Sequence, residues 1–427
     1  MTYLLPIVIA TPFVVFCLLG TLWLSGVALS EKAIVAITHA GLFVSTICLA
    51  RLLPSFFTGG TRFHSADWFR VGEYHFSIEL ELSRLATFPS LLAVLLLGLI
   101  THFSSRYIHR DRGFLRFFLM LNLFASGILT VFIGGALDVM LVGWELVGIS
   151  SVFLIAFFQE REQPVAGALR AFITYRTCDI GLLVAIVLMH RYTGNASLED
   201  ISKLTSQQAT LVACLLVLAS LGKSAQFPFS GWLPKAMEGP TPSSAAFYGA
   251  LSIHAGAFLL LKARHLIEMS PATCWGIVII GAATTLQATL SSRAAADAKS
   301  ALALGAQAQV GLIFIEIGLG WDKLALWHLC AHSVLRTLEF LRAPSTLHTY
   351  HSMHAAAGGH IPATGQFYDR FIPESLRLML YRVALDHGWV DTVLYRFILG
   401  SLIAVVNIIL TAEQRMAPIQ EKGLQDD

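Results

Sequence analysis

Charge is what this sequence has least of. Only 13% of its 427 residues are Asp, Glu, Lys or Arg, whereas a soluble domain carries about 25%. Apolar residues make up 56% of the chain, and the mean hydropathy is +0.68. These values exclude an ordinary water-soluble domain and predict a polytopic membrane protein with lipids around it. The net charge of +2 gives no indication of nucleic acid, so we expect no nucleic-acid partner.

Paired cysteines and the familiar catalytic motifs are missing too. The six cysteines occur singly and form no CxxC pair, so we interpret them as small core residues. The sequence has no nucleophile elbow and no glycine-rich phosphate loop. The spacing of His348, His351, His354 and His360 drifts around a helix, and no cysteine or acidic ligand joins them. We therefore expect no metal site, no cofactor in this chain and no enzymatic activity of its own.

Long apolar runs are what the sequence has in abundance. A spanning helix needs about 20 apolar residues, and the first run lacks the basic region and cleavage site of a signal peptide. We predict an all-α polytopic fold with eleven spans, near residues 4–25, 32–53, 85–104, 114–134, 136–158, 168–190, 209–232, 243–263, 272–290, 300–320 and 323–342. A further apolar stretch near 395–410 either spans the membrane or lies on its surface.

Arginine-rich loops indicate the orientation. The loop 104–116 carries four arginines, and basic residues near 161–170 and 293–299 fall on the same side if the spans alternate. Lys and Arg are enriched in cytoplasmic loops. We therefore predict that the N-terminus lies outside and that the tail from residue 343 begins on the cytoplasmic side.

Few ionisable residues fall inside the predicted spans. A charge at the bilayer centre costs at least about 2.5–3.5 kcal/mol, so each one is a candidate functional residue. They are Glu145, Arg176, Asp179, Lys223, His254, His328, His332 and Arg336. His254 either belongs to an ion path or only hydrogen-bonds a neighbour. The pair Arg176 and Asp179, three residues apart on one helix face, is either functional or structural.

Lys223 opens the stretch KSAQFPFSGWLPKAMEGPTP. Gly222 and Pro228 are expected to break the helix there, and irregular backbone survives at membrane depth only when it is buried or lines a polar cavity. A weaker candidate for a second broken helix starts near Lys299 and contains Glu316 near its end.

The sequence near residue 330 predicts a polar stripe. His328, His332 and Arg336 lie at i, i+4 and i+8, which makes a stripe about 12 Å long on one helix face. Histidine exchanges protons near neutral pH. A lysine without water holds its proton less tightly, and a nearby carboxylate restores that affinity. No cluster of carboxylates and carbonyls suits a hard cation, so H⁺ is favoured over Na⁺, although both remain open.

Five segments between residues 85 and 342 resemble the antiporter-like proteins of respiratory complex I and of multi-subunit cation/proton antiporters. They are GWELVGISSVFLIAFF, RTCDIG, GKSAQFPFSGWLPKAMEGPTP, AQAQVG and HLCAHSVLRTLEFL. The resemblance implies a fold with a broken helix 7, a helix-5 glutamate paired with a helix-7 lysine, and helix-11 polar residues that continue a hydrophilic axis. It assigns these roles to Glu145, Lys223, His328, His332 and Arg336, and a further acidic position to Asp179.

The chain departs from that family in two places. The family commonly has a histidine six residues after the second proline of GPTP, where this chain has Tyr248, and His254 lies six residues further on. The expected second broken helix is also missing after residue 342. We therefore expect an incomplete second inverted repeat, with N-terminal spans and an outer loop in 1–84, a first repeat in 85–263, a partial second repeat in 264–342 and a His-rich tail with a possible terminal span in 343–427.

The tail narrows the resemblance. The segments FLRAPSTLHTYHSMHAAAGGH and LYRVALDHGWVDTVLYRFI, with Tyr248 and His254, resemble the membrane subunit of DAB-type inorganic carbon transporters. This implies a cation-conducting subunit of the bacterial inner membrane, most simply for H⁺. It would energise conversion of CO₂ to bicarbonate with a large zinc-containing, carbonic-anhydrase-like partner docked on residues 343–395 at the cytoplasmic side.

Two alternatives remain. One is a proton-pumping subunit of an NADH-dehydrogenase-type complex or a multi-subunit Na⁺/H⁺ antiporter, and the other is a non-conducting membrane scaffold. Arg176, Tyr248 and Lys299 are expected to support the path in any conducting version.

Overall fold

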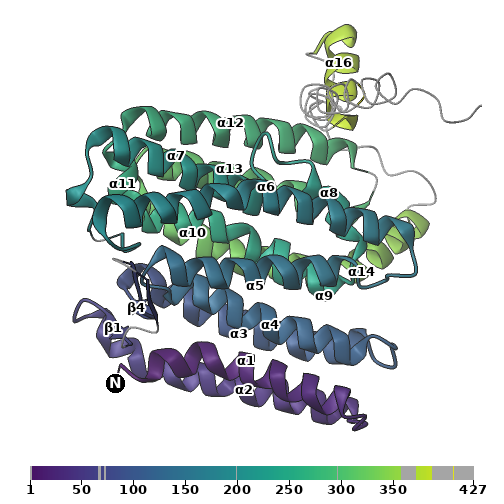
Figure 1. Ribbon diagram of the computed structural model, residues 1–427. Helices are drawn as coiled ribbons and strands as arrows, with labels where there is room; N and C mark the ends of the chain where they lie inside the picture. Colours follow the sequence, from purple (N-terminus) through teal and green to yellow (C-terminus); the bar gives the residue numbers. More distant parts are fainter. Residues whose placement is uncertain are drawn as a thin grey trace, which may run out of the picture.

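Helices make up most of this computed structural model, which describes residues 2–65, 69–71, 74–198, 200–295, 297–356, 372–386 and 407. The long helices lie side by side with their axes in one common direction (Figure 1). Helices α1 (Leu4–Leu24) and α2 (Glu31–Leu52) form one edge of the bundle, and α12 (Pro271–Ala294) forms the opposite edge (Figure 1).

Ten helical segments in the described residues are long and apolar enough to cross a membrane. They are α1 (Leu4–Leu24), α2 with η1 (Glu31–Phe56), α3 (Arg84–Tyr107), α4 (Phe114–Ile133), α5 (Leu137–Ile155), α6 (Glu162–Thr193), α7 (Ser206–Lys223), the series α9 to α10 (Thr241–Lys262), α12 (Pro271–Ala294) and α13 (Ala298–Gly318). The predicted all-α polytopic fold is confirmed.

The eleventh predicted span, 323–342, forms the first part of α14 (Asp322–Ala356). It is not among the ten because its histidines and charged side chains lower the hydropathy of the stretch. Helix α16 (Glu374–Leu385) contacts α12. The predicted stretch 395–410, apart from residue 407, and much of the predicted docking tail lie outside the described residues. The predicted sidedness and the predicted domain division stay predictions.

Shorter elements complete the described chain. They are η1 (Leu53–Phe56), η2 (Asp200–Lys203), α8 (Trp232–Lys235), η3 (Ala236–Glu238), α9 (Thr241–Ser244), the π-helical η4 (Ala245–Ala250), η5 (Ser252–His254), α10 (Ala255–Lys262) and α11 (Arg264–Glu268). The series from α9 to α10 is buried throughout. It changes from α to π to 3₁₀ geometry within a few residues, and such irregular turns often occur at functional sites.

A β-hairpin that the sequence analysis missed closes one end of the bundle. Strand β1 (Thr61–His64) pairs antiparallel with β4 (Glu79–Leu82), and β2 (Phe69–Val71) pairs with β3 (Tyr74–Phe76). Leu80 and Leu82 are buried, so β4 turns alternate side chains toward the helices. Lys262, at the end of α10, contacts the Gly134 carbonyl oxygen and lies 3.9 Å from Glu81. These contacts attach the hairpin to the bundle.

Local sequence features account for both ends of helix α7. The Thr205 side chain accepts from the Gln208 amide, and the Gln208 side chain accepts in return, which forms a capping box at the start. The helix ends at Lys223, and Ala225 takes a left-handed φ of 50°. The predicted break in this helix is confirmed. The weaker prediction of a second break is wrong, because α13 runs without interruption past Lys299 to Gly318.

Candidate functional site

Lys223 is the centre of the candidate site. Its side chain is fully buried, at 0% exposure. Its Nζ donates a hydrogen bond to the Trp144 carbonyl oxygen at 3.0 Å. It also lies 4.9 Å from the centroid of the Trp144 ring and 4.5 Å from that of the Tyr175 ring, within the range of cation–π attraction. Aromatic faces and one carbonyl therefore surround the ammonium.

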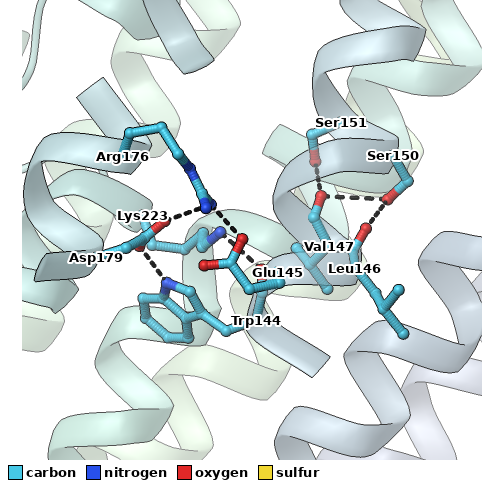
Figure 2. Close-up of polar contacts among 9 residues, drawn as sticks. All are labelled: Trp144, Glu145, Leu146, Val147, Ser150, Ser151, Arg176, Asp179 and Lys223. Atoms are coloured by element: carbon cyan, nitrogen blue, oxygen red, sulfur yellow. Dashed lines mark hydrogen bonds and ion pairs between the residues drawn. The ribbon is translucent and has the colours of Figure 1, made fainter. Parts of the chain in front are cut away.

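A cluster of three charges lies beside it, contributed by α5 and α6 (Figure 2). Arg176 forms ion pairs with both Glu145 and Asp179, and its distance to the Asp179 carboxylate is 2.7 Å. The Trp144 indole nitrogen donates to the other Asp179 oxygen at 2.5 Å. Trp144 thus links Lys223, through its carbonyl, to Asp179, through its ring. With Lys223 included, the two cations balance the two carboxylates.

This arrangement corrects one expectation. The resemblance implied a direct pair between Glu145 and Lys223, but Glu145 pairs with Arg176 instead. Within the described part of the chain, Lys223 forms no ion pair with any carboxylate. The planar guanidinium can hold two carboxylates at once, which an ammonium on a flexible stem does less well. The link from Glu145 to Lys223 is therefore indirect.

Gly148 is a residue of the site that sequence reasoning missed. It lies three residues after Glu145, on the same face of α5. A Cβ at this position would lie 3.1 Å from the Lys223 Nζ and 3.7 Å from an Arg176 nitrogen. The absent side chain therefore leaves room for both cations beside the same helix face. In the sequence, the position of Gly148 three residues after Glu145 was the one feature that could have indicated this role.

His254 and His332 form a second polar group. His254 Nε2 and His332 Nδ1 are 2.8 Å apart, and His254 Nδ1 is 3.0 Å from the Ala250 carbonyl oxygen. Arg336 Nε donates to His332 Nε2 at 3.2 Å. Because His332 Nε2 accepts, its Nδ1 carries the proton and donates to His254, whose Nδ1 proton goes to Ala250. The two rings thus form a directed hydrogen-bond chain.

The predicted stripe on α14 is present. His328 lies 6.2 Å from His332, measured between ring centroids, and Arg336 follows one turn later. His328 Nδ1 is 2.8 Å from Glu316, and its Nε2 is 3.1 Å from Gln309, both on α13. Both ring nitrogens thus face side-chain oxygens of the neighbouring helix. The structure therefore brings His254 together with the stripe, which the spacing alone did not reveal.

Tyr248 and Lys299 belong neither to the charge cluster nor to the histidine group. The Tyr248 ring is 5.7 Å from Trp232, whose ring is 4.9 Å from Tyr175, so Tyr248 joins the aromatic residues behind Lys223. Lys299 donates to the Met237 and Gly239 carbonyl oxygens at 3.1 and 2.7 Å. It holds the end of η3 and does not reach the charge cluster.

Several buried polar atoms lie around the break after α7 and in η5, the short helix that ends at His254. Ser224 Oγ, Gln226 Oε1, Ser252 Oγ and Gln307 Oε1 have no hydrogen-bond partner among the described residues. Ser224 Oγ would lie 2.4 Å from a Cβ on Gly256, so α10 approaches the break closely. Buried polar atoms in proteins are usually satisfied, often by internal water. The break after α7 is thus polar enough to hydrate.

Sequence comparison places the chain among known membrane proteins. Residues 135–359 match the family model described as NADH:quinone oxidoreductase/Mrp antiporter, TM, and residues 68–118 match the N-terminal model of complex I chain 5. The chain is 36% identical to the chloroplastic NAD(P)H-quinone oxidoreductase subunit 5 of Glycine max, over 63% of this chain and 36% of that protein. It is 32% identical to NADH-ubiquinone oxidoreductase chain 5 of Petromyzon marinus, over 66% of this chain and 47% of that protein. The matches thus span less than half the length of these relatives.

Solved structures agree on the fold. A chain in the structure of the Mrp complex from Dietzia sp. superposes with a TM-score of 0.68 and 24% identity, over 79% of this chain and 37% of that chain. A chain of the membrane-bound sulfane sulfur reductase, an archaeal respiratory membrane complex, gives 0.68 and 21%, over 79% and 55%. The first family model covers more than half of the 427 residues and includes Glu145, Lys223 and His332. This protein therefore belongs to the family of NADH:quinone oxidoreductase and Mrp antiporter transmembrane proteins.

Proposed function

We propose that this chain conducts protons across a membrane as the antiporter-like subunit of a multi-subunit complex. The observation that carries the proposal is the burial of Lys223 at the end of a broken helix, next to a cluster of charges whose net negative charge it balances. A buried ionisable group within a membrane is expensive and is kept where ions or protons move. The family and its relatives, which the matches name as quinone oxidoreductase subunits, support the same reading.

The geometry suggests how the cluster would work. Lys223 and Arg176 approach the same face of α5 beside Gly148, and Glu145 lies one turn away. When Lys223 gains a proton, its new positive charge competes with Arg176 for the Glu145 carboxylate. When it loses that proton, Glu145 returns to Arg176. The Glu145 carboxylate thus has two positions, one beside Arg176 and one beside Lys223. Protonation of Lys223 shifts the equilibrium between them.

The chemistry favours H⁺ over Na⁺. A sodium site needs several oxygen ligands around one point, as hard cations do in general. In the described cluster, both carboxylates are already bound by Arg176. Histidines and a lysine instead supply groups that carry single protons.

Flux measurements on the purified complex in liposomes test this proposal. A potassium diffusion potential would drive cations inward, and dyes inside would report pH and Na⁺ separately. We expect acidification without Na⁺ entry. Absence of any cation flux from the intact complex, together with normal folding, would leave the non-conducting scaffold as the better reading.

A second candidate function concerns the partner. The segments from residue 340 onward, with Tyr248 and His254, resemble the membrane subunit of DAB-type inorganic carbon transporters. On that reading the proton flow would energise bicarbonate accumulation in a bacterial inner membrane, through a zinc-containing, carbonic-anhydrase-like partner at the cytoplasmic side. Co-purification from the native membrane separates the two candidates. A large zinc protein in the complex favours carbon accumulation, and a set of dehydrogenase subunits favours the respiratory or antiporter role.

A further inference from the structure

We infer that a groove between α3 and α14 binds an anionic phospholipid, with the phosphate at Arg84 and Lys323 and an acyl chain along the apolar remainder of the groove. The inference is independent of the proposed proton conduction and needs only that the chain spans a membrane. It assigns a function to two cations and an apolar surface that belong neither to the charge cluster nor to the histidine group.

The groove is open to the outside of the bundle. Its volume is about 630 Å³, and small-molecule sites usually measure about 300–1,000 Å³. Phe88 on α3 and Trp327 on α14 lie on its two walls, and their ring centroids are 6.2 Å apart. Both side chains are exposed, as are those of Leu95 and Val334 further along the walls. An apolar surface of this kind, open at the side of a membrane protein, is accessible to lipid.

The charged side chains of the groove all lie at one end, which we call the mouth. Arg84 is the first residue of α3, and Asp322 and Lys323 are the first two residues of α14. The other lining residues in the described part of the chain are uncharged. The groove therefore has the polarity of an amphiphile, with one charged head and an apolar tail.

The mouth carries a net positive charge. Asp322 pairs with Arg264 at 3.3 Å. Among the residues that the structure describes, Arg84 and Lys323 form no ion pair, and both are exposed. Arg84 Nε donates to the Phe56 carbonyl oxygen at 3.1 Å, which leaves its two terminal nitrogens for an added acceptor. A guanidinium and an ammonium at one mouth suit a phosphate, which accepts charge-assisted hydrogen bonds from both.

The sign of the charge favours an anionic lipid over a zwitterionic one. The phosphate of phosphatidylglycerol is its one charged group, whereas phosphatidylcholine adds a quaternary ammonium. That cation would lie near Arg84 and Lys323, and like charges repel. Both helices also begin at the mouth, and the N-terminal end of a helix favours negative charge.

The length of the groove matches one acyl chain. Its lining runs from Leu85 to Leu95 on α3, a rise of about 15 Å at 1.5 Å per residue, and from Lys323 to Val334 on α14, a rise of about 17 Å. One leaflet is half of a hydrocarbon core of about 30 Å, which is about 15 Å. Trp321, next to the mouth, is 56% exposed, and tryptophan is enriched at the membrane–water interface. The mouth is therefore at the level of the head groups, and the groove reaches the bilayer centre.

Two protein occupants match the mouth less well. The apolar stretch near 395–410 lies outside the described residues apart from residue 407, and Arg396 is its one charged residue, so it brings no negative charge to Arg84 and Lys323. A transmembrane helix of a partner subunit would need a carboxylate at the matching level, which is costly in a membrane. A phospholipid brings the phosphate and the apolar chain in one molecule.

Native mass spectrometry of the purified complex in detergent tests the site, with phosphatidylglycerol and phosphatidylcholine as probes added after delipidation. We expect tighter binding of phosphatidylglycerol. Arg84→Gln and Lys323→Gln should each weaken this binding about fivefold, the effect of one basic residue at an anionic lipid surface. Ala331→Trp, whose ring fills the groove, should lower the number of tightly bound phosphatidylglycerol molecules by one. Arg191→Gln and Leu335→Trp, at exposed positions outside the groove, are the matched controls and should bind like the unmodified complex.

A photo-crosslink in the membrane identifies the occupant directly. Leu95 lines the groove and is 53% exposed, so benzoylphenylalanine in its place reacts with whatever occupies the inner end. We expect an adduct with the mass of an anionic phospholipid.

The outcomes separate this inference from the proposed function. Unchanged phosphatidylglycerol binding in Arg84→Gln, Lys323→Gln and Ala331→Trp overturns the inference, and so does equal affinity for the two lipids. A crosslink from position 95 to a partner subunit, or to the stretch near 395–410, assigns the groove to a protein occupant and also overturns it. None of these results affects the proposed proton conduction, which fails if the intact complex carries no proton flux.

Discussion

The hydrogen bond between Trp144 and Asp179 offers a sharp test of the charge cluster. Trp144→Phe removes the indole donor and keeps an aromatic ring over Lys223, and it leaves the backbone carbonyl that Lys223 uses. Interhelical hydrogen bonds in membrane proteins are worth about 0.6 kcal/mol on average and about 1.7 at most. Bonds to charged acceptors are worth about 1.5–3 kcal/mol in general. The Asp179 carboxylate is only 2% exposed and the bond is 2.5 Å long.

We therefore expect a coupling near the upper membrane value, about 1.5 kcal/mol. It would be measured as a double-mutant cycle of Trp144→Phe and Asp179→Asn, from reversible unfolding in mixed micelles followed by circular dichroism. Asp179→Asn also removes the ion pair with Arg176. This loss occurs both with Trp144 in place and after Trp144→Phe, so it cancels from the coupling energy. Trp327→Phe, at a position that is 69% exposed, is the matched control and should be additive with Asp179→Asn. Coupling below about 0.5 kcal/mol, the usual limit of additivity, would refute the reasoning.

Three further predictions concern transport by the reconstituted complex. Glu145→Gln should reduce proton flux by about tenfold or more, because the switch needs a charged carboxylate to move between two cations; full flux would mean that this charge is not used. His332→Ala should cost more flux than His254→Ala, because His332 touches both His254 and Arg336, and the reverse order would remove His332 from the centre of the path. Gly148→Ala should slow flux without loss of folded protein, because a Cβ 3.1 Å from the Lys223 Nζ forces the ammonium to shift; unchanged flux would show that the position of the ammonium is not critical.

Local rules predicted the parts of the site that depend on one segment. Helix-breaking residues around Lys223 predicted the end of α7, and the spacing of His328, His332 and Arg336 predicted a shared face on α14. The i, i+3 rule predicted the pair of Arg176 with its own-helix aspartate. These features follow from backbone geometry within a single helix, so the sequence alone contains them.

Contacts between helices were the parts that the sequence did not reveal. Arg176 on α6 forms an ion pair with Glu145 on α5, and His254 contacts His332 on α14. The packing of the helices sets both distances, so the sequence spacing does not contain them. The β-hairpin in 54–84 was missed because its strands are only three or four residues long. Lys299 at the start of α13 led to the wrong prediction of a second broken helix. Its side chain instead binds the carbonyl oxygens of Met237 and Gly239, at the end of η3. Pairings across helices need the fold before they can be assigned.

The most direct measurement is proton flux through the purified, reconstituted complex with and without the buried lysine. Lys223→Ala removes the fully buried ammonium at the helix break, whereas Lys235→Ala removes an exposed lysine on the same connecting segment and serves as the control. The account predicts that Lys223→Ala abolishes proton flux at a normal level of assembled complex, while Lys235→Ala conducts like the unmodified protein. Undiminished proton flux in Lys223→Ala would contradict the central claim that this lysine carries the proton.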